Sequence, residues 1–186
     1  MQASQSSIMV TPENPDRWSR SHIDPWWSTH RDLEYTNEPF NDAASLELWR
    51  SLGYTQTRFT GDMYDMRHPE PDWMADFRTH FPWQHFSWSV YRMRPGSVLP
   101  NHADTYARFV QIYDIEDLTA IHRAVVFLED WQSGHYFEID GTAITAWKAG
   151  DTITWRYDVP HIAANIGMTD RYTLQITGVP VENTFF

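Results

Sequence analysis

Residues 136–145 read Tyr136-Phe137-Glu138-Ile139-Asp140-Gly141-Thr142-Ala143-Ile144-Thr145, two short runs of strand-favouring residues around an Asp-Gly pair. Asp-Gly is a strong signal for a two-residue hairpin turn, because both turn positions adopt positive φ. Similar runs rich in Val, Ile, Thr and aromatic residues lie on either side, at Ser87–Met93, Ala107–Tyr113, Arg123–Leu128, Thr152–Trp155 and Arg171–Thr177. About eight short strands in roughly 95 residues predict a mainly β chain with flanking helices, folded as a double-stranded β-helix, the cupin-like jelly roll.

The chain of 186 residues is short enough for one domain. We expect residues 86–186 to form the jelly-roll core. Residues 1–85 are expected to form an N-terminal arm and helices that pack on the barrel. No internal repeat or low-complexity segment divides the two parts.

The N-terminal part has two predicted helices. Residues 1–40 are rich in Pro, Ser, Asn and Trp without a helical period, which predicts an extended arm. Residues 41–53 carry helix start and stop signals, and Leu48 and Leu52 fall on one face of the expected helix. A second short helix is predicted at residues 71–81, because a proline stands at its first turn.

Composition excludes several classes of function. The net charge is −11 and no Lys/Arg run is present, so we expect no nucleic-acid partner. The chain has no cysteine, which excludes disulfides, zinc fingers, iron–sulfur clusters and thiol nucleophiles. Any metal must therefore be held by His, Asp or Glu. Ten tryptophans suit either an aromatic-lined cavity or a core built from bulky side chains.

The N-terminal sequence has neither a basic segment nor an apolar one, so it does not resemble a signal peptide. No apolar stretch approaches the length of a membrane span. We therefore expect a cytoplasmic protein with no membrane partner. The oligomeric state is left open.

Three residues have the chemistry and spacing of a metal site. Residues two apart in a strand point to the same side, so His102 and Asp104 can converge on one ion. His161 is the best-placed third ligand. Two histidines and one carboxylate leave coordination positions open for a co-substrate and O2, which suits non-heme Fe(II). Taken singly, the His-x-Asp motif also fits a surface turn and His161 a loop.

A carboxylate-binding pair follows the predicted ligands. Arg171 stands ten residues after His161 and begins an apolar strand, where a buried guanidinium needs an anion. Thr173 faces the same way and adds a hydroxyl donor. An iron site with a carboxylate clamp is what a 2-oxo dicarboxylic acid requires. The alternative for Arg171 is a surface salt bridge with Asp170 or Asp158.

These features resemble the Fe(II)/2-oxoglutarate-dependent oxygenases, whose pattern is His-x-Asp, a distal His, and Arg about ten residues later followed by x-Ser/Thr. The chain is most similar to the aspartyl/asparaginyl β-hydroxylase branch, over about half its length from Tyr91 to Val179. The matching stretches are Leu99-Pro100-Asn101-His102, Ile121-His122, Trp147-Lys148-Ala149-Gly150-Asp151 and Trp155-Arg156-Tyr157-Asp158-Val159-Pro160-His161.

The resemblance implies a dioxygenase that uses Fe(II), 2-oxoglutarate and O2, hydroxylates an amino-acid side chain (free, in a peptide or in a protein), and releases succinate and CO2. It gives His122 a candidate role in holding 2-oxoglutarate, with a core histidine as the alternative. The animal enzymes of this branch lack the carboxylate ligand, whereas Asp104 stands at that place here. Related halogenases have a small residue there, so Asp104 favours hydroxylation.

Two rival functions remain at this stage. One is a non-catalytic cupin-like module that binds a small molecule on its aromatic side chains. The other is a cupin dioxygenase that uses iron without 2-oxoglutarate, although such enzymes more often use three histidines. The substrate, a small molecule or a peptide, is not named by the sequence.

Overall fold

The computed structural model describes residues 7–10, 31–34, 43–54, 60–66 and 69–181. The described helices are α2 (Ala43–Ser51), α3 (Trp73–Arg78), α4 (Ala107–Tyr113) and the short 3-10 helix η4 (Leu118–Ala120). The described strands are β1 (Ser7–Val10), β2 (Arg31–Glu34), β3 (Thr60–Asp65), β4 (Trp83–Met93), β5 (Val98–His102), β6 (His122–Phe127), β7 (His135–Ile139), β8 (Thr142–Ile144), β9 (Thr152–Arg156), β10 (His161–Asn165) and β11 (Arg171–Pro180).

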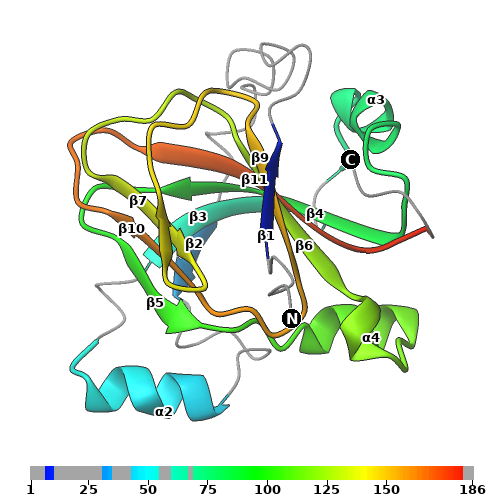
Figure 1. Ribbon diagram of the computed structural model, residues 1–186, viewed down its shortest axis with the longest axis horizontal. Helices are drawn as coiled ribbons and strands as arrows, with labels where there is room; N and C mark the ends of the chain where they lie inside the picture. The colour runs from blue at the N-terminus through cyan, green and yellow to red at the C-terminus, as the bar shows by residue number, and fades with distance from the viewer. Residues whose placement is uncertain (1–6, 11–30, 35–42, 55–59, 67–68, 182–186) are drawn as a thin grey trace, which may run out of the picture.

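The strands form two antiparallel sheets that face each other (Figure 1). The larger sheet has the order β1-β9-β6-β11-β4-β3-β2 and the smaller one the order β5-β10-β7-β8. Consecutive strands from β4 to β11 alternate between the sheets, except at the β7–β8 hairpin. This is the winding of a double-stranded β-helix, so the predicted jelly roll is confirmed.

The Asp-Gly hairpin is present as predicted. Asp140 has φ 49° and Gly141 has φ 73°, and they join β7 to β8. Phe137 pairs with Ile144 across this hairpin. Positive φ at both positions is the conformation that a tight hairpin turn needs.

Segments upstream of β4 extend the larger sheet. β1 pairs with β9 at one edge, and β3 pairs with β4 and β2 at the other. Of residues 1–40, the structure describes only these strands β1 and β2, so the extended arm predicted for the rest lies outside the described residues.

The helix predicted at residues 41–53 is present as α2, and its buried face is not the one that carries Leu48 and Leu52. Leu46 and Trp49 are buried, whereas Leu48 is 53% and Leu52 65% exposed. The buried pair is three residues apart and so shares one helix face. The tryptophan, the larger side chain, packs toward the sheets.

The predicted strand at Ala107–Tyr113 is wrong, because this segment is the helix α4. Tyr106, Phe109, Val110 and Tyr113 belong to one packed cluster. Their spacing is the helical pattern of an apolar stripe, and the abundance of strand-favouring residues obscured it. The helix therefore caps one end of the barrel instead of adding a strand to it.

Two apolar cores lie on opposite faces of the larger sheet. The outer core joins α3 to alternate residues of β4, β6 and β11, including Phe77, Trp88 and Leu174. The inner core fills the space between the sheets and includes Phe127 and Trp155. No helix in the described ranges is long and apolar enough to cross a membrane.

Candidate metal centre

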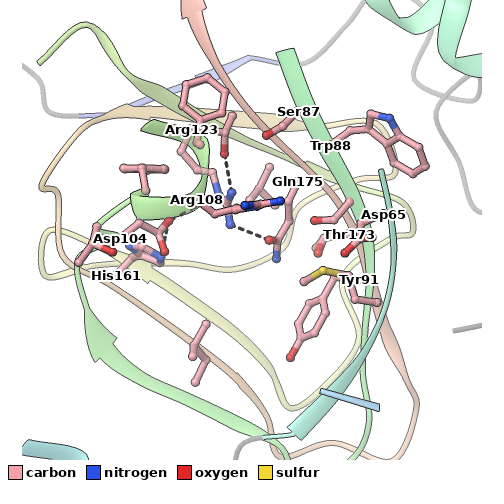
Figure 2. A pocket seen from close by; sticks show the side chains of 18 of the residues that line it. Asp65, Ser87, Trp88, Tyr91, Asp104, Arg108, Arg123, His161, Thr173 and Gln175 are labelled. Atoms are coloured by element: carbon pink, nitrogen blue, oxygen red, sulfur yellow. Dashed lines mark hydrogen bonds and ion pairs between the residues drawn. The ribbon is translucent and has the colours of Figure 1, made fainter. Parts of the chain in front are cut away.

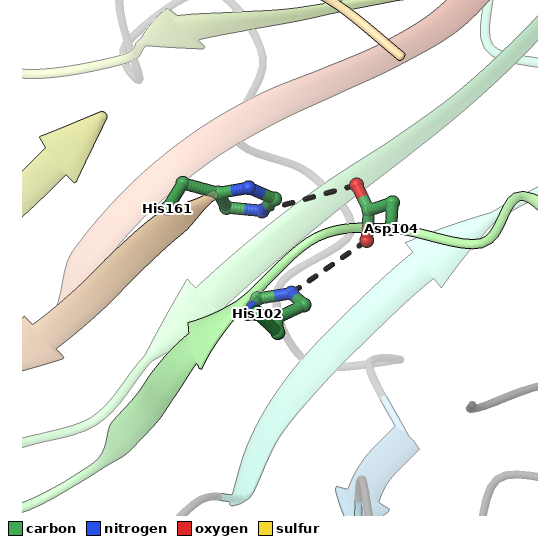
Figure 3. Close-up of side chains that lie close together, drawn as sticks. All are labelled: His102, Asp104 and His161. Carbon is green, nitrogen blue, oxygen red and sulfur yellow. Dashed lines mark ion pairs between the residues drawn. The ribbon is translucent and has the colours of Figure 1, made fainter. Parts of the chain in front are cut away.

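The three predicted ligands meet at one end of the barrel (Figure 3). His102 ends β5 and His161 begins β10, and these two residues are direct partners in the antiparallel ladder. Their ring centroids are 4.3 Å apart. Asp104 lies in the loop that follows β5, and one ligand atom from each residue lies within 4.8 Å of the others.

Local irregularities place the histidines. The register between β5 and β10 shifts between His161 and Ala163, a β-bulge of the kind that re-aims side chains at functional sites. Pro100 lies in this stretch and has no N–H to give to the ladder. Trp49 of α2 meets the His102 ring edge-on at 5.4 Å, and its indole N–H donates to the Asn101 carbonyl at 3.2 Å.

Backbone carbonyls fix the tautomer of both imidazoles. Nδ1 of His102 lies 2.8 Å from the Pro100 carbonyl, and Nδ1 of His161 lies 3.1 Å from the Val159 carbonyl. A carbonyl only accepts, so Nδ1 carries the hydrogen and Nε2 of the neutral ring has a lone pair. Those Nε2 atoms lie 3.6 Å and 3.8 Å from the Asp104 carboxylate oxygens. This orientation is typical of metal-ligating histidines.

The electrostatics of the cluster favour a cation at its centre. Burial raises the pKa of Asp104, but the Arg123 guanidinium and the two imidazoles lower it more, so its pKa lies well below the ordinary value. Burial, with His102 nearby, lowers the pKa of His161 to about 4. Near neutral pH the Asp104 carboxylate therefore faces the lone pair of the neutral His161 ring. The buried Oδ2 of Asp104 has no hydrogen-bond partner, so a divalent metal fits this donor set.

Arg123 adds a cation beside the cluster. Its Nε lies 3.6 Å from Oδ2 of Asp104, and its terminal nitrogens donate to Thr177 and Gln175, each at 2.7 Å. Arg123 follows His122 on β6, so the two side chains face opposite sides of the strand, and Arg123 is the one that reaches the cavity.

The metal cluster opens into a cavity of about 580 Å³ between the sheets (Figure 2). Arg171 and Thr173 line the same cavity. Arg171 is buried, donates to the Tyr136 carbonyl at 2.7 Å, and lies 5.6 Å from the Phe137 ring centre. The Thr173 hydroxyl is buried without a hydrogen-bond partner. A polar ligand that reaches this end of the cavity would meet a cation and an unsatisfied hydroxyl.

The distance between the two ends of the cavity follows from strand β7. His161 pairs with Ile139, and the Arg171 guanidinium bonds to Tyr136, three residues further along the same strand. Three strand residues correspond to about 10 Å. That separation is comparable to the length of a five-carbon dicarboxylate with a contact at each end.

His122 is not brought to the cavity, which corrects the expected role in holding 2-oxoglutarate. Its ring lies 6.2 Å from Trp83, a residue of the outer core. His122 and Arg123 are consecutive residues of β6, so they point to opposite faces of the sheet. Burial lowers the pKa of His122, which suits the alternative of a neutral core histidine.

Other cavity walls are aromatic. Trp155 and Tyr91 line it from β9 and β4, and the Trp155 ring lies 5.1 Å from that of His161. Tyr106 ends the loop that carries Asp104. The φ of Tyr106 is 53°, a left-handed conformation that costs energy in an aromatic residue. These aromatic side chains form the cavity wall near the cluster.

Comparisons with known proteins support the fold. No family model matches the chain, and no curated protein does. A prolyl-4-hydroxylase from Pseudomonas putida is similar in structure, with a TM-score of 0.59, 14% identity, and coverage of 94% of this chain and 92% of that one. A predicted oxalate decarboxylase from Thermotoga maritima has a TM-score of 0.41 at 16% identity, covering 64% and 81%. The Schizosaccharomyces pombe Cnp3 cupin domain has a TM-score of 0.40 at 12% identity, covering 64% of each chain. The likeness to the prolyl-4-hydroxylase extends over nearly the whole chain, and the strand topology is that of a jelly roll.

Proposed function

We propose that this chain is an Fe(II)/2-oxoglutarate-dependent oxygenase that hydroxylates an amino-acid side chain, free or in a peptide or protein. The observation that carries the proposal is one cavity lined by a His-Asp-His cluster at one end and by buried Arg171 and Thr173 at the other. The fold likeness to a prolyl-4-hydroxylase also supports a hydroxylase.

In this proposal His102, Asp104 and His161 hold the iron. The carbonyl contacts of the two Nδ1 atoms leave both Nε2 atoms able to act as ligands, and the carboxylate is already deprotonated. Three protein ligands would leave coordination positions for the co-substrate and O2. When bound, iron with 2-oxoglutarate and O2 supplies an oxidant for a C–H bond and yields succinate and CO2.

Arg171 and Thr173 bind the distal carboxylate of 2-oxoglutarate. A guanidinium and a hydroxyl on one strand face give charge-assisted hydrogen bonds to both oxygens of a carboxylate. The contact from Arg171 to the Tyr136 carbonyl fixes the guanidinium in place, so little side-chain entropy is lost on binding. The aromatic walls exclude water from the reacting end of the cavity.

Asp104 also bears on the type of reaction. A carboxylate that occupies the third ligand position leaves no room there for a halide, so the proposal is hydroxylation or a related C–H oxidation. Asp104 is held by the Arg123 ion pair at 3.6 Å, which keeps it directed into the cluster.

The test is succinate formation from 2-oxoglutarate in air, with Fe(II)-loaded protein, ascorbate as the reductant and no other substrate. Slow succinate release that is lost in Asp104→Ala and absent with Zn(II) supports the proposal. A cupin dioxygenase would bind iron but leave 2-oxoglutarate intact. A binding module would show neither iron-dependent turnover nor sensitivity to the Asp104 change.

A further inference from the structure

The cavity lining includes polar residues that are not assigned above as metal ligands or as the carboxylate clamp. They belong to α4, β4, β6 and β11 and are Arg108, Arg123, Ser87, Gln175 and Thr177. Arg123 already forms an ion pair with Asp104, and Arg108 donates to Gln111 at 3.0 Å. Because both arginines line the cavity, they contribute positive charge to the space that a substrate would enter.

Arg123 is fixed in an orientation that suits an anion. Thr177 and Gln175 accept from its two terminal nitrogens at 2.7 Å, and its Nε faces Asp104 at 3.6 Å (Figure 2). A guanidinium has five N–H groups, so one on each terminal nitrogen is left for a ligand. A preorganised planar cation of this kind favours carboxylates over neutral groups.

The charge balance of the cavity also favours an anion. The charges of a divalent ion, Asp104, 2-oxoglutarate and Arg171 cancel. Among the other charged residues described in the lining, Arg108 and Arg123 are positive and Asp65 is negative. The cavity thus keeps a net positive charge, although the whole chain has a net charge of −11. Attraction of an anionic ligand would therefore come from the arginines that line the cavity and not from the overall charge of the protein.

We infer that the primary substrate carries a carboxylate that binds Arg123, with Arg108 adding a second positive charge. This inference rests on the proposed oxygenase function. Because Arg123 also contacts Asp104, a carboxylate on Arg123 lies next to the metal cluster. The carbon that is oxidised is therefore close to that carboxylate in the substrate.

The probe is a matched pair of small molecules, propionate and propionamide, which differ in charge but hardly in shape. The protein is loaded with Mn(II) and saturating 2-oxoglutarate, and paramagnetic broadening of the probe's proton signals is measured by NMR. We expect propionate to be broadened about tenfold more than propionamide, because a charge-assisted contact is lost in the amide. Equal broadening of the two probes would overturn the inference.

Variants identify the residue that binds. Arg123→Gln should remove most of the propionate excess, and Arg123→Lys should keep part of it. Arg108→Gln, a change at an exposed residue, should reduce it by about threefold through its charge alone. Arg156→Gln is the matched control, since Arg156 is an exposed arginine that ends β9 and does not line the cavity. An excess that persists in Arg123→Gln would mean that the acid binds the metal or Arg171, which overturns the assignment.

Failure of the proposed function gives a different result. If the wild-type protein binds neither Mn(II) nor 2-oxoglutarate, the oxygenase proposal fails. Saturation transfer from the metal-free protein to the same probes then tests the anion site alone, and an Arg123-dependent preference for propionate supports it. A second probe pair is tri-alanine with a free or an amidated C-terminus. If the site accepts a peptide end, the free acid should be broadened more than the amide by about the same ratio as for propionate and propionamide. If the site accepts only a small-molecule acid, the two peptides should be broadened equally.

Discussion

Along β11, the residues that face the cavity differ in chemistry from those that face α3. Arg171, Thr173, Gln175 and Thr177 line the cavity. The alternate residues Tyr172, Leu174 and Ile176 are buried in the outer apolar core. One strand therefore carries polar cavity-lining side chains on one side and much of the apolar packing on the other.

The difference shows how the molecule accommodates a polar cavity in its centre. Burying polar groups without partners costs free energy, and the cavity side contains a hydroxyl of that kind at Thr173. The outer face offsets this cost, because apolar side chains of α3, β4, β6 and β11 are buried there in one cluster. We therefore expect changes on the two faces to separate function from stability.

The largest expected effect is on the cavity face. Arg171→Ala should raise the dissociation constant for 2-oxoglutarate at least about 30-fold, because loss of a buried charge partner costs roughly 2–5 kcal/mol. Isothermal titration with the Zn(II)-loaded protein measures this. Arg156→Ala, at an exposed arginine of the same sheet, should leave the constant unchanged. Parental affinity in Arg171→Ala would show that the clamp lies elsewhere.

A substitution on the outer face of β11 should change the free energy of unfolding and not ligand binding. Leu174 is fully buried, so Leu174→Ala should lower the free energy of unfolding by about 2–5 kcal/mol. Urea denaturation measures the loss. The affinity of the folded fraction for metal and 2-oxoglutarate should stay within about twofold. A large loss of affinity with intact stability would contradict the separation of the two faces.

The cavity side should also make stability depend on pH. The pKa of His161 falls from 6.5 to about 4 on folding, so the unfolded chain binds a proton that the folded one does not. Stability from this group is present above pH 6.5 and is lost as the pH falls toward about 4, at about 1.4 kcal/mol per unit. Denaturation of metal-free protein at several pH values should show a shallower slope in His161→Gln. The Leu174→Ala variant should keep the parental slope.

The smallest effect should come from the hydroxyl next to the clamp. Thr173→Val should weaken 2-oxoglutarate binding about tenfold, since a hydrogen bond to a charged group contributes roughly 1.5–3 kcal/mol. The free energy of unfolding should stay the same or rise, because the hydroxyl has no partner. Thr173→Ser restores the donor and should bind like the parent. Reduced stability in Thr173→Val with unchanged affinity would mean a structural hydroxyl.

Much of the fold was predictable because its signals are local. The Asp140-Gly141 turn needs only positive φ, and the shared face of Arg171 and Thr173 needs only strand alternation. The helix α4 was missed because its strand-favouring residues masked a helical stripe. The strands β1, β2 and β3 were missed because they join the larger sheet only through tertiary pairing, β1 with β9 and β3 with both β4 and β2.

The site was predictable in part for the same reason. The spacing of His102 and Asp104 indicates a shared side, and their meeting with His161 follows once β5 pairs with β10. The assignment on β6 failed because His122 and Arg123 are both polar and the residues after them are buried on both faces. Strand alternation predicts that His122 and Arg123 point to opposite faces of the sheet. Only the tertiary structure shows that Arg123 is the one that enters the cavity.

The most direct test of the central claim, one cavity that holds both iron and 2-oxoglutarate, is the visible absorption spectrum of the purified protein under anaerobic conditions. Fe(II) and 2-oxoglutarate are added separately and then together. We predict a weak charge-transfer band that requires both and is lost in Asp104→Ala and in Arg171→Ala. Iron binding without the band, or no iron binding at all, would contradict the claim.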